Sequence, residues 1–177
     1  MTYSGVAPLY LERGFQPIPV KGKTPPPPGA TGRNGVVNEQ SIQRWAHDPE
    51  WSGQNTALRA SPLEVRIDVD DYGTKNGAAQ LAALEELLGP LPATYSSTSR
   101  GADSPSRQYF LTLKEPVEMV GKAPLGTDID VVQSHHRYSV VFPSFHPETG
   151  SPYLWFDPEG EQIAAPPYVT DPEYLPE

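Results

Sequence analysis

The stretch that decides the fold is LEVRIDVDDY, residues 63–72, in which apolar and charged side chains alternate strictly. Such alternation is typical of a β-strand, because successive side chains of a strand point to opposite faces. The apolar face, which we predict to be core, carries Leu63, Val65, Ile67 and Val69. The opposite, polar face carries Glu64, Arg66, Asp68 and Asp70.

Asp68 and Asp70 would then lie on the same side of the strand, with their Cα atoms roughly 6 to 7 Å apart. Two carboxylates this close repel each other, and a divalent cation relieves the repulsion. The pair is therefore a candidate metal site. The alternative interpretation is that both are solvated acids on the polar face of an ordinary half-exposed strand.

The composition bounds the fold and the kind of metal. The chain has 177 residues, enough for one domain or for one domain built of two lobes. Its 22 prolines and 15 glycines predict many loops and short strands in a folded protein. There is no cysteine, so a metal must be held by oxygen or imidazole ligands, which favours Mg²⁺ or Mn²⁺ over structural zinc.

The charge and hydropathy of the chain exclude some partners. A net charge of -9 argues against a protein that coats duplex nucleic acid nonspecifically, because that affinity comes from Lys and Arg. No apolar run approaches the ~18 residues of a membrane span, and the amino terminus lacks the pattern of a signal peptide. We therefore expect a cytoplasmic protein that makes no membrane contact.

The pattern of elements predicts an α+β domain. Helices are expected at residues 3–13, 38–45 and 77–89, the last with a stripe of Leu81, Leu84, Leu87 and Leu88. Strands are expected at residues 15–20, 55–60, 63–70, 94–99, 107–113, 129–132, 139–142 and 153–156. The prolines of the first strand place it at a sheet edge, and the second and third strands are close enough to predict a hairpin. The segment 164–177 has the composition of a Pro-rich tail or linker.

A third carboxylate would complete a site for two metal ions. The stretch GTDIDVV, residues 126–132, offers Asp128 and Asp130 on the polar face of another predicted strand. Either residue could join Asp68 and Asp70 in holding two ions roughly 3.5 to 4 Å apart, as phosphoryl transfer requires.

Cationic side chains near these acids could hold a triphosphate. Arg107 opens a predicted strand, and a guanidinium there can grip phosphate or make a surface ion pair. The stretch HHRY places His135, His136 and Arg137 just beyond Asp130. Adjacent histidines of an extended chain point to opposite faces, so they are not expected to share one metal. Walker and dinucleotide glycine loops are absent from the sequence, so those binding modes are unsupported.

The order of motifs resembles the Prim-Pol domain of the archaeo-eukaryotic primase superfamily, in the form found in actinobacteria and their phages and plasmids. The motifs are, in order, GFQPIPVKGKTP, SIQRW, NTALRA, IDVDDYGTKNG, LEELLGPLPATYSSTSR, SRQYF, IDVVQSHHRYSVVFPSFHPETG and YLWFDP. The resemblance covers residues 5 to about 158. The resemblance implies a primase fold, in which an RRM-like mixed or antiparallel sheet (61–163) is coupled to an N-terminal αβ unit (1–60).

The resemblance also implies roles for single residues. The first acidic motif of the family falls on Asp68 and Asp70, and the carboxylate of its third motif falls on Asp130. Arg107 occupies the position of a family histidine that touches the incoming triphosphate, which is a departure that the actinobacterial form shares. His136 and Arg137 match a subgroup motif beside the site and are expected to contact the nucleotide.

The expected function is that of a DNA-dependent primase and polymerase. Such a domain makes and extends primers from nucleoside triphosphates on a single-stranded DNA template, with two divalent cations, Mg²⁺ or Mn²⁺. A downstream helicase or helical domain is an expected partner. Two alternatives stay open: a catalytically degenerate module of the same fold that binds nucleotide or DNA, and a metal-dependent nucleotide-sugar transferase that uses the same acid pair.

Overall fold

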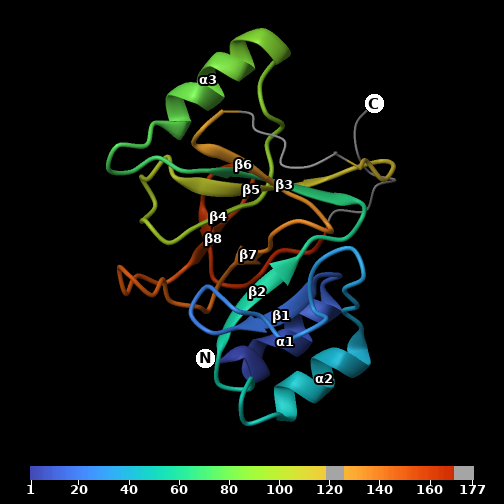
Figure 1. Ribbon diagram of the computed structural model, residues 1–177. Coiled ribbons are helices and arrows are strands. Elements are labelled where there is room, and N and C mark those ends of the chain that lie inside the picture. The colour runs from blue at the N-terminus through green and yellow to red at the C-terminus, as the bar shows by residue number, and fades with distance from the viewer. Residues whose placement is uncertain (119–125, 170–177) are drawn as a thin grey trace.

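The computed structural model describes residues 1–118 and 126–169 (Figure 1). Its helices are α1 (Tyr3–Glu12), α2 (Glu39–His47) and α3 (Gly77–Leu88). Its strands are β1 (Gln16–Val20), β2 (Asn55–Arg59), β3 (Glu64–Val69), β4 (Ser96–Thr98), β5 (Arg107–Thr112), β6 (Ile129–Val132), β7 (Ser139–Val140), β8 (Leu154–Phe156) and β9 (Gln162–Ile163). Helices combined with antiparallel sheets confirm the predicted α+β class. Among the described helices, none has the length and apolar character needed to span a membrane.

The first sheet has the strand order β1-β2-β7 and lies with α1 and α2 in the lower half of Figure 1. β1 is an edge strand, as its prolines predict, because proline has no N–H to donate to a second neighbour. α2 begins at the predicted cap, where the Asn38 side chain accepts a hydrogen bond from the Ser41 N–H at 2.9 Å. Ile42 and Trp45 of this helix are buried against Ile18 of the sheet.

The second sheet has the order β6-β3-β5-β4-β8-β9, and every pairing in it is antiparallel. Its first four strands have the RRM-like arrangement, with β3 and β5 central. On one face α3 packs against Ile67, Val69, Ile129 and Val131. On the other face Phe110 and Trp155 pack against α1 and β2. The central strand β3 is therefore covered on both sides.

The predicted hairpin between residues 55–60 and 63–70 is wrong. β2 pairs with β1 and β7 in the first sheet, whereas β3 pairs with β5 and β6 in the second. The short connection at Ser61 and Pro62 therefore carries the chain from one sheet to the other. Alternation and a short connection predict two strands, but they do not say which neighbour each strand will pair with.

The face of β3 that was predicted to be polar lies in the interior between the two sheets. Arg66 is 0% exposed and Glu64 is 5% exposed. The Arg66 guanidinium donates to Glu64 Oε1 at 3.0 Å and to the Leu58 carbonyl of β2 at 2.7 Å. It also lies 4.8 Å from the centre of the Phe110 ring. These contacts pair the buried charges and tie β3 to β2 across the two sheets.

The apolar stripe predicted on α3 is only half buried. Leu81 and Leu84 pack against the second sheet, in agreement with the prediction. Leu87 and Leu88 are 75% and 79% exposed, so their burial was wrongly predicted. The helix ends as expected at Gly89, whose φ of 93° lies in the region that favours glycine. Its last turn extends beyond the edge of the sheet that it covers.

The first residues of the segment expected to be a tail pack against the domain. Pro166 is buried, and Val169 joins the apolar core that β8 and α1 share. The Val169 N–H donates to the Arg13 carbonyl at 3.0 Å. Packing therefore continues past the boundary that we expected at residue 163, and residues 170–177 lie outside the described part of the chain.

Candidate active site

The register of β3 and β6 brings carboxylates of two strands together. Asp68 lies directly opposite Asp130. Directly opposed residues of an antiparallel pair project from the same face, here the face turned toward the first sheet. Asp70 follows two residues after Asp68, and the charges of Asp70 and Asp130 both act on Asp68. The three carboxylates named from the sequence therefore form one acidic cluster.

Asp68 is a half-buried member of this cluster. Part of its surface stays exposed, but protein atoms surround it on most sides. Burial, together with the charges of Asp70 and Asp130, raises the pKa of Asp68 to about 6. A hydrogen bond from Gln108, which lies opposite Asp68 on β5, acts in the other direction. The cluster therefore concentrates negative charge where hydration is poor, and a bound cation would lower its energy.

Two cationic side chains already contact the cluster. Arg137 Nη1 lies 2.6 Å from Asp130 Oδ2, and Lys75 Nζ donates to Asp70 Oδ2. The backbone of Arg137 has a φ of 66°, the one positive φ among the described residues other than glycine. A residue other than glycine in that region costs about 1 kcal/mol or more. The contacts that Arg137 makes with the rest of the protein must therefore offset this cost.

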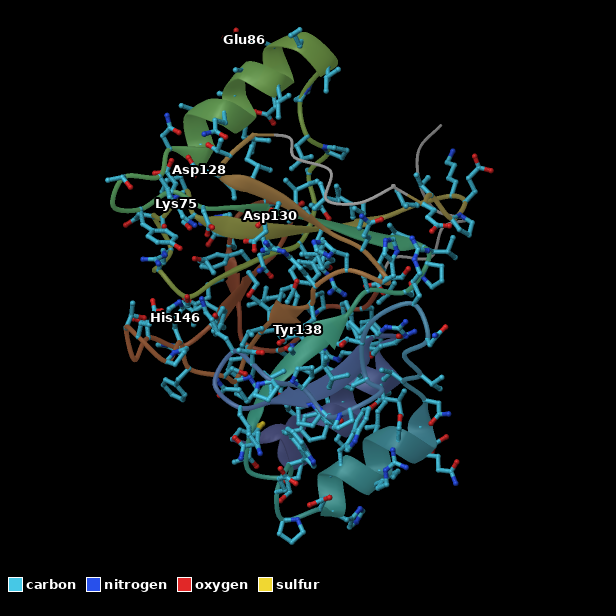
Figure 2. All side chains as sticks on the ribbon, in the orientation of Figure 1. Lys75, Glu86, Asp128, Asp130, Tyr138 and His146 are labelled. Carbon is cyan, nitrogen blue, oxygen red and sulfur yellow. The ribbon has the colours of Figure 1, made fainter. Side chains whose placement is uncertain are left out.

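Asp128 lies at the beginning of α3, which its carboxylate contacts (Figure 2). Its Oδ2 accepts hydrogen bonds from the Asn76 N–H at 3.2 Å and from Gln80 Nε2 at 2.9 Å. Its backbone carbonyl accepts from the Asp70 N–H at 2.9 Å. Asp128 therefore fixes the loop that carries Asp70, and its carboxylate serves the start of the helix.

A cleft of about 80 Å³ opens beside Asp68 and Asp70. Lys23, Arg100 and His146 also line it, and further polar groups are supplied by Thr98, Ser99, Ser106 and Tyr153. The cleft thus combines carboxylates with cationic and hydroxyl groups. This combination suits an anionic ligand that arrives with a metal ion, because the carboxylates hold the metal and the basic groups hold the anion.

The basic side chains reach the cleft from three loops. Lys23 belongs to the loop 21–34, where its carbonyl accepts a hydrogen bond from the Tyr138 hydroxyl at 2.8 Å. The Arg100 guanidinium lies 3.4 Å from the centre of the Tyr72 ring, a cation–π contact. His146, labelled in Figure 2, is buried and stacks on Tyr153 at 6.1 Å. Burial and the charge of Lys23 lower the pKa of His146, so its imidazole is neutral near pH 7.

Arg107 is among the residues that line the cleft with Asp68 and Asp70, but its guanidinium binds other groups. Arg107 lies opposite Val69, so its side chain leaves the sheet on the α3 face, one residue out of step with Asp68. Its guanidinium donates to the Ala102 carbonyl at 2.7 Å and packs 4.9 Å from the Phe156 ring centre. These contacts hold the loop before β5 in place beside the cleft.

His136 and Arg137 differ in their placement although they are adjacent. His136 closes a tight turn, in which its N–H and carbonyl exchange hydrogen bonds with Gln133 at 2.9 and 3.1 Å. It is half-buried and does not line the cleft. Arg137 is the member of this motif that reaches the acidic cluster.

The donor set of the cluster fits a hard divalent cation. Carboxylate oxygens are the ligands that Mg²⁺ and Mn²⁺ prefer, and the protein already directs positive groups to two of the three carboxylates. Within residues 1–118 and 126–169, however, no three His, Asp or Glu side chains are arranged to hold a metal as they stand.

Sequence reasoning missed several residues of this site. Lys75 follows Asp70 by five residues in a turn, and the DDYGTKNG composition is the signal that could have found it. Arg100 and His146 lie in loops whose path depends on the whole sheet, so no local pattern predicts that they line the cleft. Lys23 shares its loop with Lys21 and Arg33, and no local signal separates it from these other cations.

Comparison with known proteins identifies the family. A family model described as bifunctional DNA primase/polymerase, N-terminal, matches residues 7–176, nearly the whole chain. The comparison with curated proteins gives no match. The matched range contains the acidic cluster and the cleft beside it. The chain therefore belongs to the Prim-Pol family, the N-terminal domains of bifunctional DNA primase/polymerases.

Proposed function

We propose that this domain synthesises and extends primers from nucleoside triphosphates on a single-stranded DNA template. Membership in the family supports a nucleotidyltransferase of the primase/polymerase type. The observation that carries the finer proposal is the cleft, in which Asp68 and Asp70 adjoin Lys23, Arg100 and His146. Phosphoryl transfer needs this pairing of metal-binding oxygens with cations that hold the transferred phosphates.

The proposed roles follow from these positions. Asp68, Asp70 and Asp130 hold the metal, because they are the acids that converge from β3 and β6. Divalent cations bound there would lower the pKa of the attacking 3′ hydroxyl and neutralise charge on the leaving pyrophosphate. Lys23 and Arg100 orient the triphosphate from the loops around the cleft. The neutral His146 donates or accepts a hydrogen bond beside them.

Arg137 and Arg107 take roles that differ from those expected of them. Arg137 acts at the acidic cluster, since its guanidinium contacts Asp130. Arg107 acts on the loop 101–106 and positions the rim of the cleft, since its guanidinium donates to the Ala102 and Ser104 carbonyls.

A primer-extension assay with labelled nucleotides in Mn²⁺, in Mg²⁺ and in EDTA tests the proposal. We expect incorporation with either metal and none with EDTA. Asp68→Asn and Asp70→Asn should each reduce incorporation by about 100-fold or more, because each removes a carboxylate that holds the metal, and the metal stabilises the charge of the transition state. Glu86→Gln is the matched control, since it removes one negative charge from the exposed surface of α3, far from the cleft (Figure 2).

A second candidate is a module that binds nucleotide or DNA without catalysis. The observation that favours it is that Lys75 and Arg137 already neutralise two of the three carboxylates. It predicts that the parent protein binds nucleoside triphosphate but incorporates none in any metal. The same assay, run beside nucleotide binding by calorimetry, separates the two candidates. No observation in the described residues favours the nucleotide-sugar transferase.

A further inference from the structure

Two ion pairs join the acidic cluster to residues outside the strands. Arg137, in the segment between β6 and β7, contacts Asp130, and Lys75, in the turn before α3, contacts Asp70. The side chains of Arg137 and Lys75 are 42% and 37% exposed, whereas those of Asp130 and Asp70 are 16% and 31% exposed. The acids are thus the more buried partners, and each cation is the more exposed member of its pair.

Neither ion pair is explained by a need of the local fold. The loop that carries Asp70 is already fixed by the backbone bonds of Asp70 to Asp128 and to Gly77. Arg137 adopts a backbone conformation that suits glycine better, so the turn itself does not call for an arginine. What the two cations share is their target, because each contacts one flank of the cluster that has Asp68 at its centre.

We propose that Arg137 and Lys75 are exchangeable counter-ions, which neutralise Asp130 and Asp70 in the metal-free protein and must be displaced before divalent cations bind. The inference rests on the proposed function, in which these carboxylates hold the metal. Three carboxylates without partners would repel one another, and the two cations offset part of that repulsion. The same cations then compete with the metal and weaken its binding.

Displacement frees both cations for a different anion. A nucleoside triphosphate that arrives with its metal supplies that anion beside Asp70. Lys75, displaced from the Asp70 carboxylate, can then contact the triphosphate. The exchange therefore links the two ligands: a metal ion should bind more tightly when a triphosphate is present to accept the released cations. Metal alone must displace the ion pairs without this compensation.

The test is Mn²⁺ affinity without nucleotide or DNA, measured by the paramagnetic resonance of free Mn²⁺. Arg137→Gln and Lys75→Gln should each bind Mn²⁺ roughly fivefold more tightly than the parent, since each removes one competing partially exposed ion pair. Arg137→Lys, which keeps a cation there, should stay within about twofold of the parent. Lys23→Gln and Arg100→Gln are matched controls, because each removes one positive charge from the cleft beside Asp68 and Asp70, whereas the ion pairs to Asp70 and Asp130 are made by Lys75 and Arg137.

A fold check is built into the series. Arg137→Gly removes the guanidinium and suits the positive φ, so it should fold at least as well as the parent and bind Mn²⁺ as Arg137→Gln does. If the parent binds Mn²⁺ and Arg137→Gly and Lys75→Gln bind it no more tightly than the Lys23 and Arg100 controls, the counter-ion inference is overturned while the metal site stands. If no protein in the series binds Mn²⁺, the metal site of the proposed function and the inference both fall.

Discussion

The carboxyl group of Asp68 makes the stability of the folded protein depend on pH. Its pKa is raised to about 6 by burial and by the charges of Asp70 and Asp130, from an ordinary value of 3.8. The folded protein therefore holds this proton more tightly than the unfolded chain does. The resulting stabilisation is fully present below pH 3.8 and is lost as the pH rises through 6.

We expect Asp68→Asn to flatten this part of the pH profile of stability. In EDTA, the free energy of unfolding of the variant, taken relative to that of the parent, should rise by on the order of 2 kcal/mol from pH 4 to pH 7, since one pKa unit is worth ~1.4 kcal/mol. Urea unfolding at the two pH values measures the gain, and Glu86→Gln is the control variant. Parallel profiles for parent and Asp68→Asn would show that Asp68 ionises in the fold without cost.

At the scale of elements, Gly77 sets the approach of α3 to the acidic loop. The Gly77 N–H donates to the Asp70 carbonyl at 3.0 Å. A Cβ at this position would lie 2.6 Å from that carbonyl oxygen and 2.8 Å from the Asp128 carbonyl oxygen, closer than real Cβ atoms come. Only glycine lets the helix begin against the two segments that carry the acids.

Gly77→Ala should therefore shift the start of α3 and move Asp70. We expect a loss of about 1 to 3 kcal/mol in the free energy of unfolding, typical of overpacking at a tight contact, together with reduced nucleotide incorporation. Gly53→Ala is the matched control, because nothing lies within 4 Å of an added Cβ there. Thermal unfolding and primer extension of both variants check the prediction, and equal behaviour would mean that the helix start adjusts freely.

The elements themselves were largely predictable, but their partners were not. Asn38 and Gly89 carry local signals for the beginning and end of helices, and the structure has both where the sequence places them. The same local rules failed for residues 55–70, because a strand pattern does not encode which sheet the strand enters. They failed for Leu87 because a helix can extend beyond the sheet it covers.

The site was predictable to the extent that strand alternation fixes direction. Asp68 and Asp130 share a face because both alternate with buried apolar residues and pair directly. Arg107 was named from its place at the start of a predicted strand and from the resemblance, but that strand has apolar residues on both faces, so the pattern could not say which face meets Asp68. The cations of the cleft arrive on loops and could not be placed without the tertiary structure.

At the scale of the whole molecule, Arg66 joins the two sheets. Its guanidinium lies on β3 and donates to the Leu58 and Arg59 carbonyls of β2 as well as to Glu64. Removing it would leave the Glu64 carboxylate and two carbonyls buried without this donor. A buried charge that loses its partner typically costs about 3 to 5 kcal/mol.

We therefore expect Arg66→Met to destabilise the protein by about 3 to 5 kcal/mol. The double variant Glu64→Gln with Arg66→Met should be the more stable of the two, since it leaves no buried carboxylate unpaired. Urea unfolding of the parent, the single and the double variants at pH 7 measures both values. A loss below about 1 kcal/mol in the single variant, the level of an exposed pair, would mean that water replaces the guanidinium.

The late position of the short strand β7 in the sequence affects how the first sheet folds during synthesis. Ser139 and Val140 pair with Leu58 and Ala57. The first sheet is therefore completed by residues that the ribosome adds about 80 positions after β2. At roughly 5 to 20 residues per second, the nascent N-terminal unit waits about 4 to 16 s for its third strand. During that interval one side of β2 is an unpaired strand edge. If translation stalls before residue 139, this edge stays exposed to other nascent chains on the same messenger RNA.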